Sequence, residues 1–481
     1  MAVAEKTALL PRWYGVPSGV ILACLVPAVF YYALLLTVGT AGLLAPAEHG
    51  PIFNSMLLHL LQGRFDVDPA SVGDEGYLRD GATYAYFGIF PALFRVLFLW
   101  LPDFAHADLT RVGCLAAVSA MALFKIATAR LVWRQAGKEA PSVLLTMLTI
   151  AILLSGPQIQ FLRPSVYQEV MLWSGALTAA FVYLVLRGLC DGAGFTPRLM
   201  NWMALVAGLT LLTRVSAALG PYLGLGVVWL YVAWTAFKSG KLREQLVGLA
   251  APTAVLAGFV VLTGFINAER WGNPWTFVDL SRALILAQYP DRLARLHAYG
   301  EFNPIRIGFG LIYYFLPLWV LRDGNGHFWW GDFQERVYDN GIELPPSSFF
   351  VSDPLLIALA VCGAVAVWRY HDRERRVLVM SCALALFVPA GLLLTFPSLT
   401  FRYRMEFYPF FELFAFLGFQ KLASRPTART VNLVAIGAFA GVITAHAMWV
   451  IYFLSPLGLA IKVMGPLGII DFYHSRLLIG S

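Results

Sequence analysis

Charged residues are scarce in this sequence. Only 13% of its 481 residues are Asp, Glu, Lys or Arg, whereas 59% are hydrophobic. Apolar stretches of about twenty residues recur along the chain, and this is the length that a helix needs to cross a bilayer. The composition excludes a soluble globular protein and predicts an all-α polytopic membrane protein.

Several sequence signals of other protein classes are also missing. The five cysteines lie in or beside apolar stretches, which gives no support for a disulfide framework or a cysteine metal motif. The histidines lack metal-ligand spacing, so no metal site is assigned to them. No glycine-rich phosphate loop and no nucleophile elbow is present, which argues against direct ATP use and serine hydrolysis. The absence of two similar halves argues against many secondary transporters.

The basic residues are arranged as membrane topology requires. The net charge is +7, but Lys and Arg occur in short clusters between apolar spans, so nucleic acid is not expected as a partner. Placing these clusters in the cytoplasm puts the N-terminus inside and gives about eleven spans in a single transmembrane domain over residues 1–481. The expected spans are residues 16–44, 110–133, 142–161, 170–187, 200–218, 220–237, 245–266, 354–369, 377–396, 407–420 and 431–454.

Two long segments are then expected outside the cytoplasm, at residues 45–109 and 267–353. In the first, Pro51 to Leu61 has apolar residues at helical spacing and predicts a short helix on the membrane surface. Phe87 to Leu101 is apolar but short and interrupted by proline, which predicts an interfacial or re-entrant helix rather than a span.

The first outer segment, residues 45–109, carries a concentration of carboxylates, which are costly near lipid and therefore indicate a site. Glu48, where the first span ends, is the first candidate for a general base, followed by Asp66 and Asp68. Asp80 and Tyr84 are candidates for substrate binding. Two alternatives remain open: these aspartates solvate and cap a surface loop, or Asp66, Asp68 and Asp80 hold a divalent cation such as Mg²⁺ or Mn²⁺.

Arginines at the outer membrane boundary are the candidates for binding phosphate. Arg402 and Arg404 flank Tyr403 where a late span begins, and guanidinium groups recognise phosphate oxygens in a defined geometry. The alternative is that they anchor the helix end at the interface. Arg214 lies deep in an apolar stretch, so it is expected either to contact the phosphate or to form a buried ion pair with a carboxylate. Arg270 is a weaker candidate of the same kind.

A further acidic residue, Glu169, lies where an outer loop re-enters the membrane. Glu169 and Arg163 are both candidates for substrate binding. The alternative is that they form an interfacial ion pair with each other, and the sequence does not decide between these interpretations.

The order of spans and loops resembles the membrane-embedded GT-C glycosyltransferases, such as lipid A aminoarabinose transferases and protein O-mannosyltransferases. The stretches that carry the resemblance are Glu48-His49, the following PIFNSMLLHLLQGRFD, LTLLTRVSAAL, INAERWGNPWTF and FRYRMEFYPFF. The family usually has Asp-Glu where this chain has Glu48-His49. The resemblance implies a polyprenyl-phosphate-linked sugar donor, and some members of the family have a second acidic residue near the position that Glu169 occupies here.

We therefore expect an inverting glycosyltransferase of a bacterial inner membrane that uses a polyprenyl-phosphate sugar outside the cytoplasm. A glycan, a lipid or a protein is the expected acceptor, and membrane lipids surround the chain. Glu48 would activate the acceptor hydroxyl, while the arginines hold the donor phosphate. The alternatives are a flippase or transporter of a lipid-linked glycan, and an O-antigen ligase or polymerase. A flippase should carry charged residues through the middle of many spans.

Overall fold

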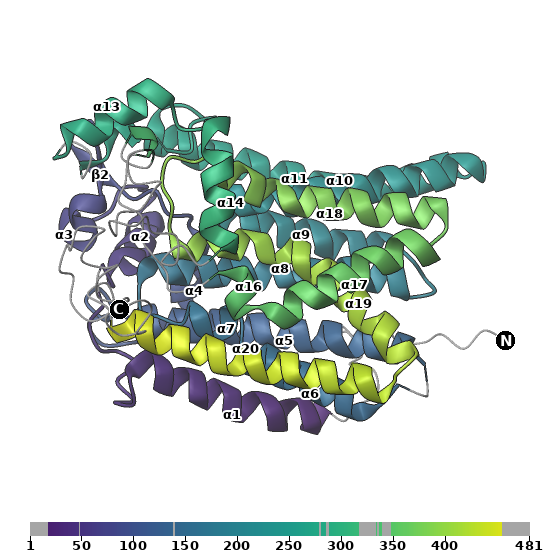
Figure 1. The fold of residues 1–481 in the computed structure, drawn as a ribbon. Helices are drawn as coiled ribbons and strands as arrows, with labels where there is room; N and C mark the ends of the chain where they lie inside the picture. Colours follow the sequence, from purple (N-terminus) through teal and green to yellow (C-terminus); the bar gives the residue numbers. More distant parts are fainter. Residues whose placement is uncertain are drawn as a thin grey trace.

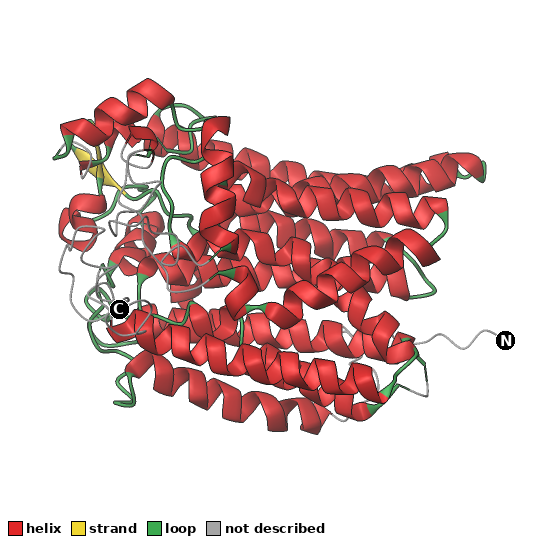
Figure 2. Ribbon diagram, viewed as in Figure 1, coloured by secondary structure: helices red, strands yellow, loops and turns green. Residues whose placement is uncertain are grey.

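The computed structural model describes residues 18–47, 49–137, 140–278, 280–284, 288–316, 333, 336–338 and 348–454. In this part the chain is mostly helical, and long helices lie side by side in one bundle (Figures 1 and 2). The described residues contain one two-stranded sheet, at one end of the bundle. The expected helical membrane architecture is therefore confirmed.

Each expected span coincides with one helix of the bundle. Seven described helical segments are long and apolar enough to cross a membrane, and one of them, Ser142–Gln160, joins α6 to the short helix that follows it. Helices α1, α9, α17 and α19 are not among these seven segments. The bundle consists of α1 (Ser18–Thr37), α5 (Thr110–Gln135), α6 (Ser142–Leu154), α8 (Val166–Cys190), α9 (Pro197–Thr213), α10 (Val215–Lys238), α11 (Leu242–Trp271), α17 (Pro354–Tyr370), α18 (Arg373–Leu393), α19 (Tyr408–Ser424) and α20 (Ala428–Leu454).

Several helices begin at residues that satisfy the first free backbone N–H groups. The Ser165 hydroxyl accepts a hydrogen bond from the Tyr167 amide at the start of α8, at 3.3 Å. Thr196 caps α9 in the same way, with Pro197 in the first turn. Asp372 accepts from the Arg375 amide at 2.8 Å and begins α18. These caps define where the chain enters a helix.

The pair α17 and α19 shows how closely the helices approach. A Cβ atom on Gly363 would collide with the backbone of α19 at Phe414, and one on Gly418 would collide with α17 at Leu359. Small residues allow this approach, and in a membrane van der Waals packing is a main source of helix association. The two glycines are therefore required for this contact.

Short elements form a layer over one end of the bundle, at the left of Figure 1. Residues 45–109 contribute α2 (Ile52–Leu61), α3 (Pro69–Val72), the 3₁₀ helix η1 (Gly73–Glu75), the hairpin β1 (Tyr77–Arg79) and β2 (Ala82–Tyr84), α4 (Phe90–Phe94) and η2 (Arg95–Phe98). Other loops contribute η3 (Leu280–Arg282), α13 (Pro290–Tyr299), η4 (Pro304–Arg306) and α14 (Ile307–Phe315). Three further short elements, α7 (Pro157–Gln160), α16 (Phe349–Ser352) and η6 (Phe401–Phe407), pack among the long helices.

The predicted short helix at Pro51–Leu61 exists as α2, but it does not lie with an open apolar face on the membrane. Ile52, Phe53 and Met56 are buried and pack in a small core with Val72 and Phe87. The expected interfacial segment at residues 87–101 forms α4 and η2, which are too short to span. Together these elements form a folded layer.

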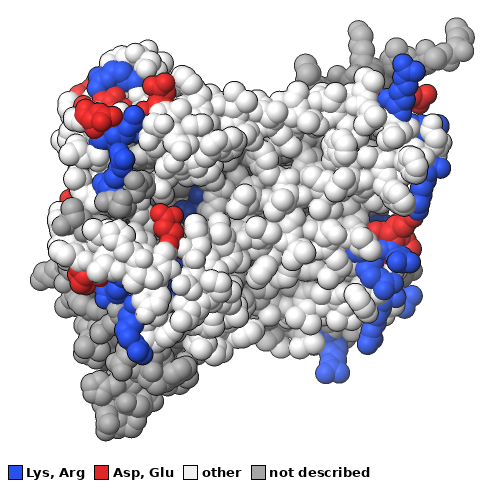
Figure 3. All heavy atoms as spheres, turned by 90° about the horizontal axis from the view of Figure 1, so that it is seen from above, with Lys and Arg blue, Asp and Glu red and all other residues white. Residues whose placement is uncertain are grey.

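Charged side chains gather at the two ends of the molecule, with an almost uncharged band between them (Figure 3). The end opposite the layer of short elements is rich in Lys and Arg, including Lys238, Lys241 and Arg243 between α10 and α11. The band matches the apolar surface that a bilayer requires. The positive-inside rule predicts that this basic end faces the cytoplasm.

The close contact of α17 and α19 generates a prediction about stability. Gly363→Ala should destabilise the protein by about 1–3 kcal/mol, because the added methyl group has no space against α19. The measurement is the thermal midpoint of the detergent-solubilised protein. Gly226→Ala is the control, since no atom lies within 4 Å of the added Cβ on α10. Equal midpoints for the two variants would contradict the prediction.

Candidate functional site

A cavity lies where the layer of short elements meets the bundle. Its empty space is about 1720 Å³, part of it open to solvent. The loop after β2, the first turn of α8, the break between α9 and α10, the end of α11, the end of α18 and η6 form its walls. The lining includes charged and polar side chains, among them Glu75, Tyr86, Tyr167, Arg214, Asn267, Arg270, Arg402 and Tyr403.

Two arginines flank one tyrosine in the wall of this cavity. The Cζ of Arg214 is 5.1 Å from the centroid of the Tyr403 ring, and the Cζ of Arg402 is 5.6 Å from the same centroid. Arg402 also lies over Tyr167, at 4.5 Å. The aromatic faces favour these cationic positions, so both guanidinium groups are held at the cavity.

Arg214 is the single residue between α9 and α10. Its backbone is extended, with φ −156° and ψ 116°, so the chain leaves α9 and enters α10 at this point. Its Nε donates to Glu406 Oε1 at 2.7 Å. Val215 and Ser216, at the N-terminus of α10, also line the cavity, and a helix N-terminus favours anions. The break lies earlier than the sequence boundary expected near residue 219.

Arg270 is buried in the cavity wall without a carboxylate partner. It is 4% exposed. Its Nη1 donates to the Phe87 carbonyl at 2.9 Å and its Nη2 lies 3.5 Å from the Met56 sulfur. Its Nε has no hydrogen-bond partner, and no carboxylate in the described part of the chain pairs with it. A buried cation is costly without a counter-charge, so an anion bound in the cavity would be stabilised here.

Among the described residues that line the cavity, Glu75 is the one Asp or Glu side chain. It ends η1 and is half-buried. The Tyr167 hydroxyl donates a hydrogen bond to it. Burial raises the pKa of nearby Tyr86 well above its ordinary value, and the charge of Glu75 adds to this effect. Tyr86 therefore remains a neutral phenol, and the cavity has an acidic side next to its basic one.

Gly88 brings the acidic and the basic sides of the cavity together. A Cβ atom at this position would collide with the carbonyl oxygens of Leu212 and Thr213 at the end of α9. Only glycine allows the loop to rest directly on the backbone beside Arg214. This contact positions the loop that follows Glu75 against the α9–α10 break.

Four of the residues predicted from the sequence meet in this cavity: Arg214, Arg270, Arg402 and Tyr403. Tyr84 lies behind the wall, paired with Tyr77 across the hairpin and packed on Trp271 at 6.0 Å between ring centroids. Glu48 lies outside the described residues, and its role as a base stays a prediction.

Asp66 and Asp68 do not line the cavity. Asp66 accepts a hydrogen bond from Arg64 and lies 3.2 Å from His59 Nδ1, and Asp68 accepts from the Ser55 hydroxyl at 2.9 Å. Partial burial works against ionisation of Asp66, but the Arg64 hydrogen bond and the His59 charge outweigh it and lower its pKa. A carboxylate with a lowered pKa is a weak base. These contacts fit a structural role better than catalysis.

Asp80 is a turn residue. It lies between β1 and β2 with φ +51°, followed by Gly81 with φ +79°, as an Asp-Gly hairpin turn requires. Its side chain is 79% exposed and pairs with Arg79 at 3.1 Å. Asp80 is therefore not brought to Asp66 and Asp68, and the described residues contain no group of three or more His, Cys, Asp or Glu that could hold a metal ion.

Glu169 and Arg404 form buried ion pairs away from the cavity. Glu169 pairs with Arg95 at 2.7 Å, not with Arg163, and both partners are fully buried. Arg163 does not line the cavity either. Arg404 pairs with Asp353 at 2.7 Å on the opposite side of η6 from Arg402. The prediction that Arg404 binds the donor is corrected, because Arg404 does not line the cavity and its guanidinium group is fully buried against Asp353 inside the bundle.

The structure adds Glu75, Tyr86, Tyr167 and Gly88 to the site. Glu75 was visible in the sequence as one of several loop carboxylates, but nothing in the spacing distinguished it from the others. Tyr167 lies two residues before Glu169, and its residue type and position carry no signal for a site in the sequence alone. The sequence carried no signal for the close approach at Gly88.

Comparison with known proteins gives a fold similarity only. No protein-family model matches the chain, and no curated protein matches it. Among solved structures, it is similar to the oligosaccharyltransferase of Archaeoglobus fulgidus. The structure tethered with an acceptor peptide aligns over 91% of this chain at 14% identity, with a TM-score of 0.45.

Two further structures of that archaeal protein align over 89% of this chain. The complex with an inhibitory peptide and a dolichol-phosphate has 15% identity and a TM-score of 0.46, and the complex with Zn and sulfate has 14% and 0.47. The chain spans about half the length of these structures, at 53–55%. Similarity at this level assigns no function to the chain, so its function has to follow from the cavity.

The contrast between the two buried arginines Arg270 and Arg404 generates a prediction. Arg270→Met should change the free energy of unfolding little, because it removes a charge without a carboxylate partner. Arg404→Met should lower the free energy of unfolding by about 3–5 kcal/mol, because it leaves Asp353 buried without its cation. Denaturation of both variants in detergent measures this difference. If Arg270→Met destabilises as strongly, Arg270 is a structural group and not a binding group.

Proposed function

We propose that this protein is a membrane glycosyltransferase that takes a sugar from a polyprenyl-phosphate donor. The observation that carries the proposal is Arg270, a buried cation without a carboxylate partner in the described chain, in a cavity shared with Arg214 and Arg402. Three guanidinium groups at the boundary of an apolar band suit a phosphate that is attached to a lipid.

The cavity has an apolar side for the lipid chain of the donor. Leu392, Leu393 and Phe396 at the end of α18 face Phe277 and Phe302 from the outer layer. These residues adjoin the arginines, so one ligand can place its phosphate on the basic side and its isoprenoid chain on the apolar side. The site therefore matches an amphiphilic anion.

Among the described residues we propose Glu75 as the general base, because it lines the cavity and Asp66 and Asp68 do not. Glu48, the first candidate from the sequence, lies outside the described residues. The acceptor oxygen attacks the anomeric carbon, its proton moves to Glu75, and the bond from that carbon to the phosphate oxygen breaks. The electron pair of that bond remains on the leaving polyprenyl phosphate, where the arginines stabilise the developing charge. Direct displacement of this kind inverts the anomeric configuration. No step is assigned to a metal ion.

The cavity lies at the end of the bundle opposite the Lys- and Arg-rich end. Under the positive-inside rule this supports a reaction outside the cytoplasm, and we propose the inner membrane of a bacterium as the location of the protein. The proposed acceptor is a glycan, a lipid or a protein.

The proposed role of Glu75 as general base leads to a prediction about the rate of sugar transfer. In purified protein, Glu75→Gln should lower single-turnover transfer from the donor by about 10²–10⁴-fold, because the amide cannot accept the acceptor proton. Asp66→Asn and Asp68→Asn should retain activity close to that of the native protein. The donor for this assay is the polyprenyl-phosphate sugar identified by mass spectrometry of lipids that co-purify with Glu75→Gln.

The same experiment separates the enzyme from the alternatives. A transporter would move the lipid-linked sugar between leaflets unchanged, so release of free polyprenyl phosphate distinguishes transfer from flipping. Arg402→Ala and Arg270→Met should lose the co-purifying lipid, whereas Arg295→Ala, on exposed α13 outside the cavity, should keep it. Full activity in Glu75→Gln would overturn the proposed base, and unchanged lipid content in the arginine variants would overturn the donor site.

A further inference from the structure

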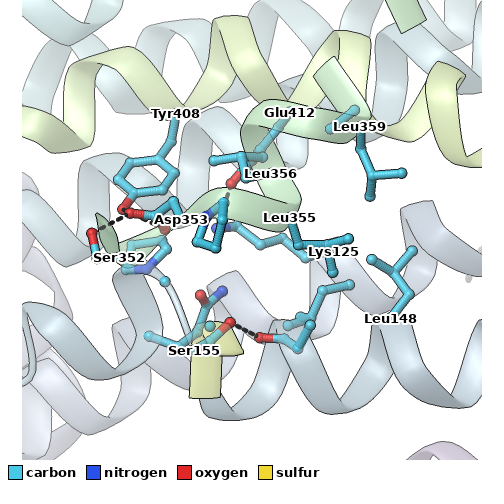
Figure 4. Close-up of a pocket in the computed structure, with 18 of the residues that line it drawn as sticks. Lys125, Leu148, Ser155, Ser352, Asp353, Leu355, Leu356, Leu359, Tyr408 and Glu412 are labelled. Atoms are coloured by element: carbon cyan, nitrogen blue, oxygen red, sulfur yellow. Dashed lines mark hydrogen bonds and ion pairs between the residues drawn. The ribbon is translucent and has the colours of Figure 1, made fainter. Parts of the chain in front are cut away.

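A second cavity lies inside the bundle, among α5, α6, α7, α17, α19 and α20 (Figure 4). Its empty space is about 610 Å³, part of it open to the surroundings. None of its lining residues is shared with the first cavity. Most of its wall is apolar and comes from Leu148, Ile152, Leu355, Leu356, Leu359 and Phe416.

The charged groups around this cavity are already balanced. Lys125 Nζ lies 2.5 Å from Glu412 Oε1, and each residue is 5% exposed. Asp353 pairs with Arg404 at 2.7 Å and accepts from the Tyr408 hydroxyl at 3.1 Å. In Figure 4, Asp353, Ser352 and Tyr408 gather on one side, and Leu148 and Leu359 lie on the other. A ligand with a net charge would leave that charge uncompensated in an apolar site.

One hydrogen-bond donor in the wall is left without a partner. Gln158 lines the cavity and is 1% exposed, and its Nε2 has no hydrogen-bond acceptor within the described chain. It lies in α7, directly after the break at Gly156, where φ is +60°. A buried amide donor without a partner is unfavourable, so an oxygen acceptor placed at this position would be stabilised.

We propose that this cavity binds an uncharged single-chain lipid whose hydroxyl or carbonyl oxygen accepts a hydrogen bond from Gln158. The hydrocarbon chain of the lipid lies along the leucine-rich side between α6 and α17. The balanced ion pairs select against a charged head group, and the apolar wall selects for a long chain. This site is distinct from the donor cavity and does not depend on the proposed transfer reaction.

The test uses a hexadecanol that carries a photoactivatable diazirine, with the full chain reconstituted in phosphatidylcholine nanodiscs. After illumination, mass spectrometry locates the cross-linked peptides. Labelling is expected on peptides from α6 and α17, with saturation as the probe concentration rises and competition by unlabelled hexadecanol. A hexadecanoate probe and a hexadecyltrimethylammonium probe should label these peptides at least about fivefold less.

Two variants test the wall of the cavity. Ala151→Phe places a ring in the cavity and should abolish specific labelling. Gln158→Leu keeps a similar side-chain size but removes the donor, and it should weaken apparent hexadecanol binding by about fivefold. Val261→Phe on α11 is the control, because this side chain is 71% exposed on another face and should leave labelling unchanged. Equal thermal midpoints confirm that each variant is folded.

The alternatives give different results in the same experiment. Stronger labelling by hexadecanoate than by hexadecanol would overturn the selection for an uncharged head group. Labelling that is equal on α6, α17 and α11, or that persists in Ala151→Phe, would show contact with bulk lipid and overturn the site. These results do not depend on the proposed transferase reaction, because the experiment measures lipid binding alone. If the protein proved to have no transferase activity, the expected labelling would be the same.

Discussion

The cost of burying charge in an apolar bundle governs the arrangement of this protein. Lys125 pairs with Glu412, Arg95 with Glu169, Arg214 with Glu406 and Arg404 with Asp353. In each pair the partner comes from a different helix or loop, so neutralising the charges also fastens the elements together. Arg270 departs from this pattern in the described chain, and it lies in the cavity that we assign to an anionic donor.

The donor cavity exists because the chain is irregular where helices meet the outer layer. Arg214 interrupts the helical path between α9 and α10, which turns its guanidinium group and the first turn of α10 toward the cavity. Gly88 lets the first outer loop rest on that break. In membrane proteins, irregular backbone is tolerated where it lines a cavity or is buried in protein. The break at Arg214 and the close contact at Gly88 therefore both lie at the proposed site.

One short segment, η6, separates the two cavities. Arg402 and Tyr403 line the donor cavity, whereas Arg404 forms the Asp353 ion pair beside the second cavity. Tyr408, which follows η6, lines the second cavity. The segment is a 3₁₀ helix, with 3 residues per turn, so neighbouring side chains leave it in different directions. Two arginines that are almost adjacent in the sequence thus have opposite roles, one at a ligand site and one in a buried ion pair.

The sequence by itself determined the membrane class, the positions of the spanning helices and the basic end, because apolar stretches and Lys and Arg clusters are local properties. It also predicted Arg214, Arg270 and Arg402, which line the cavity, since a cation in an apolar segment is costly wherever it packs. Only the tertiary structure brought Glu75 into the lining of this cavity and left Asp80 and Arg404 outside it. Those assignments depend on which residues distant in the sequence become neighbours, and the helix packing and the contact at Gly88 decide this.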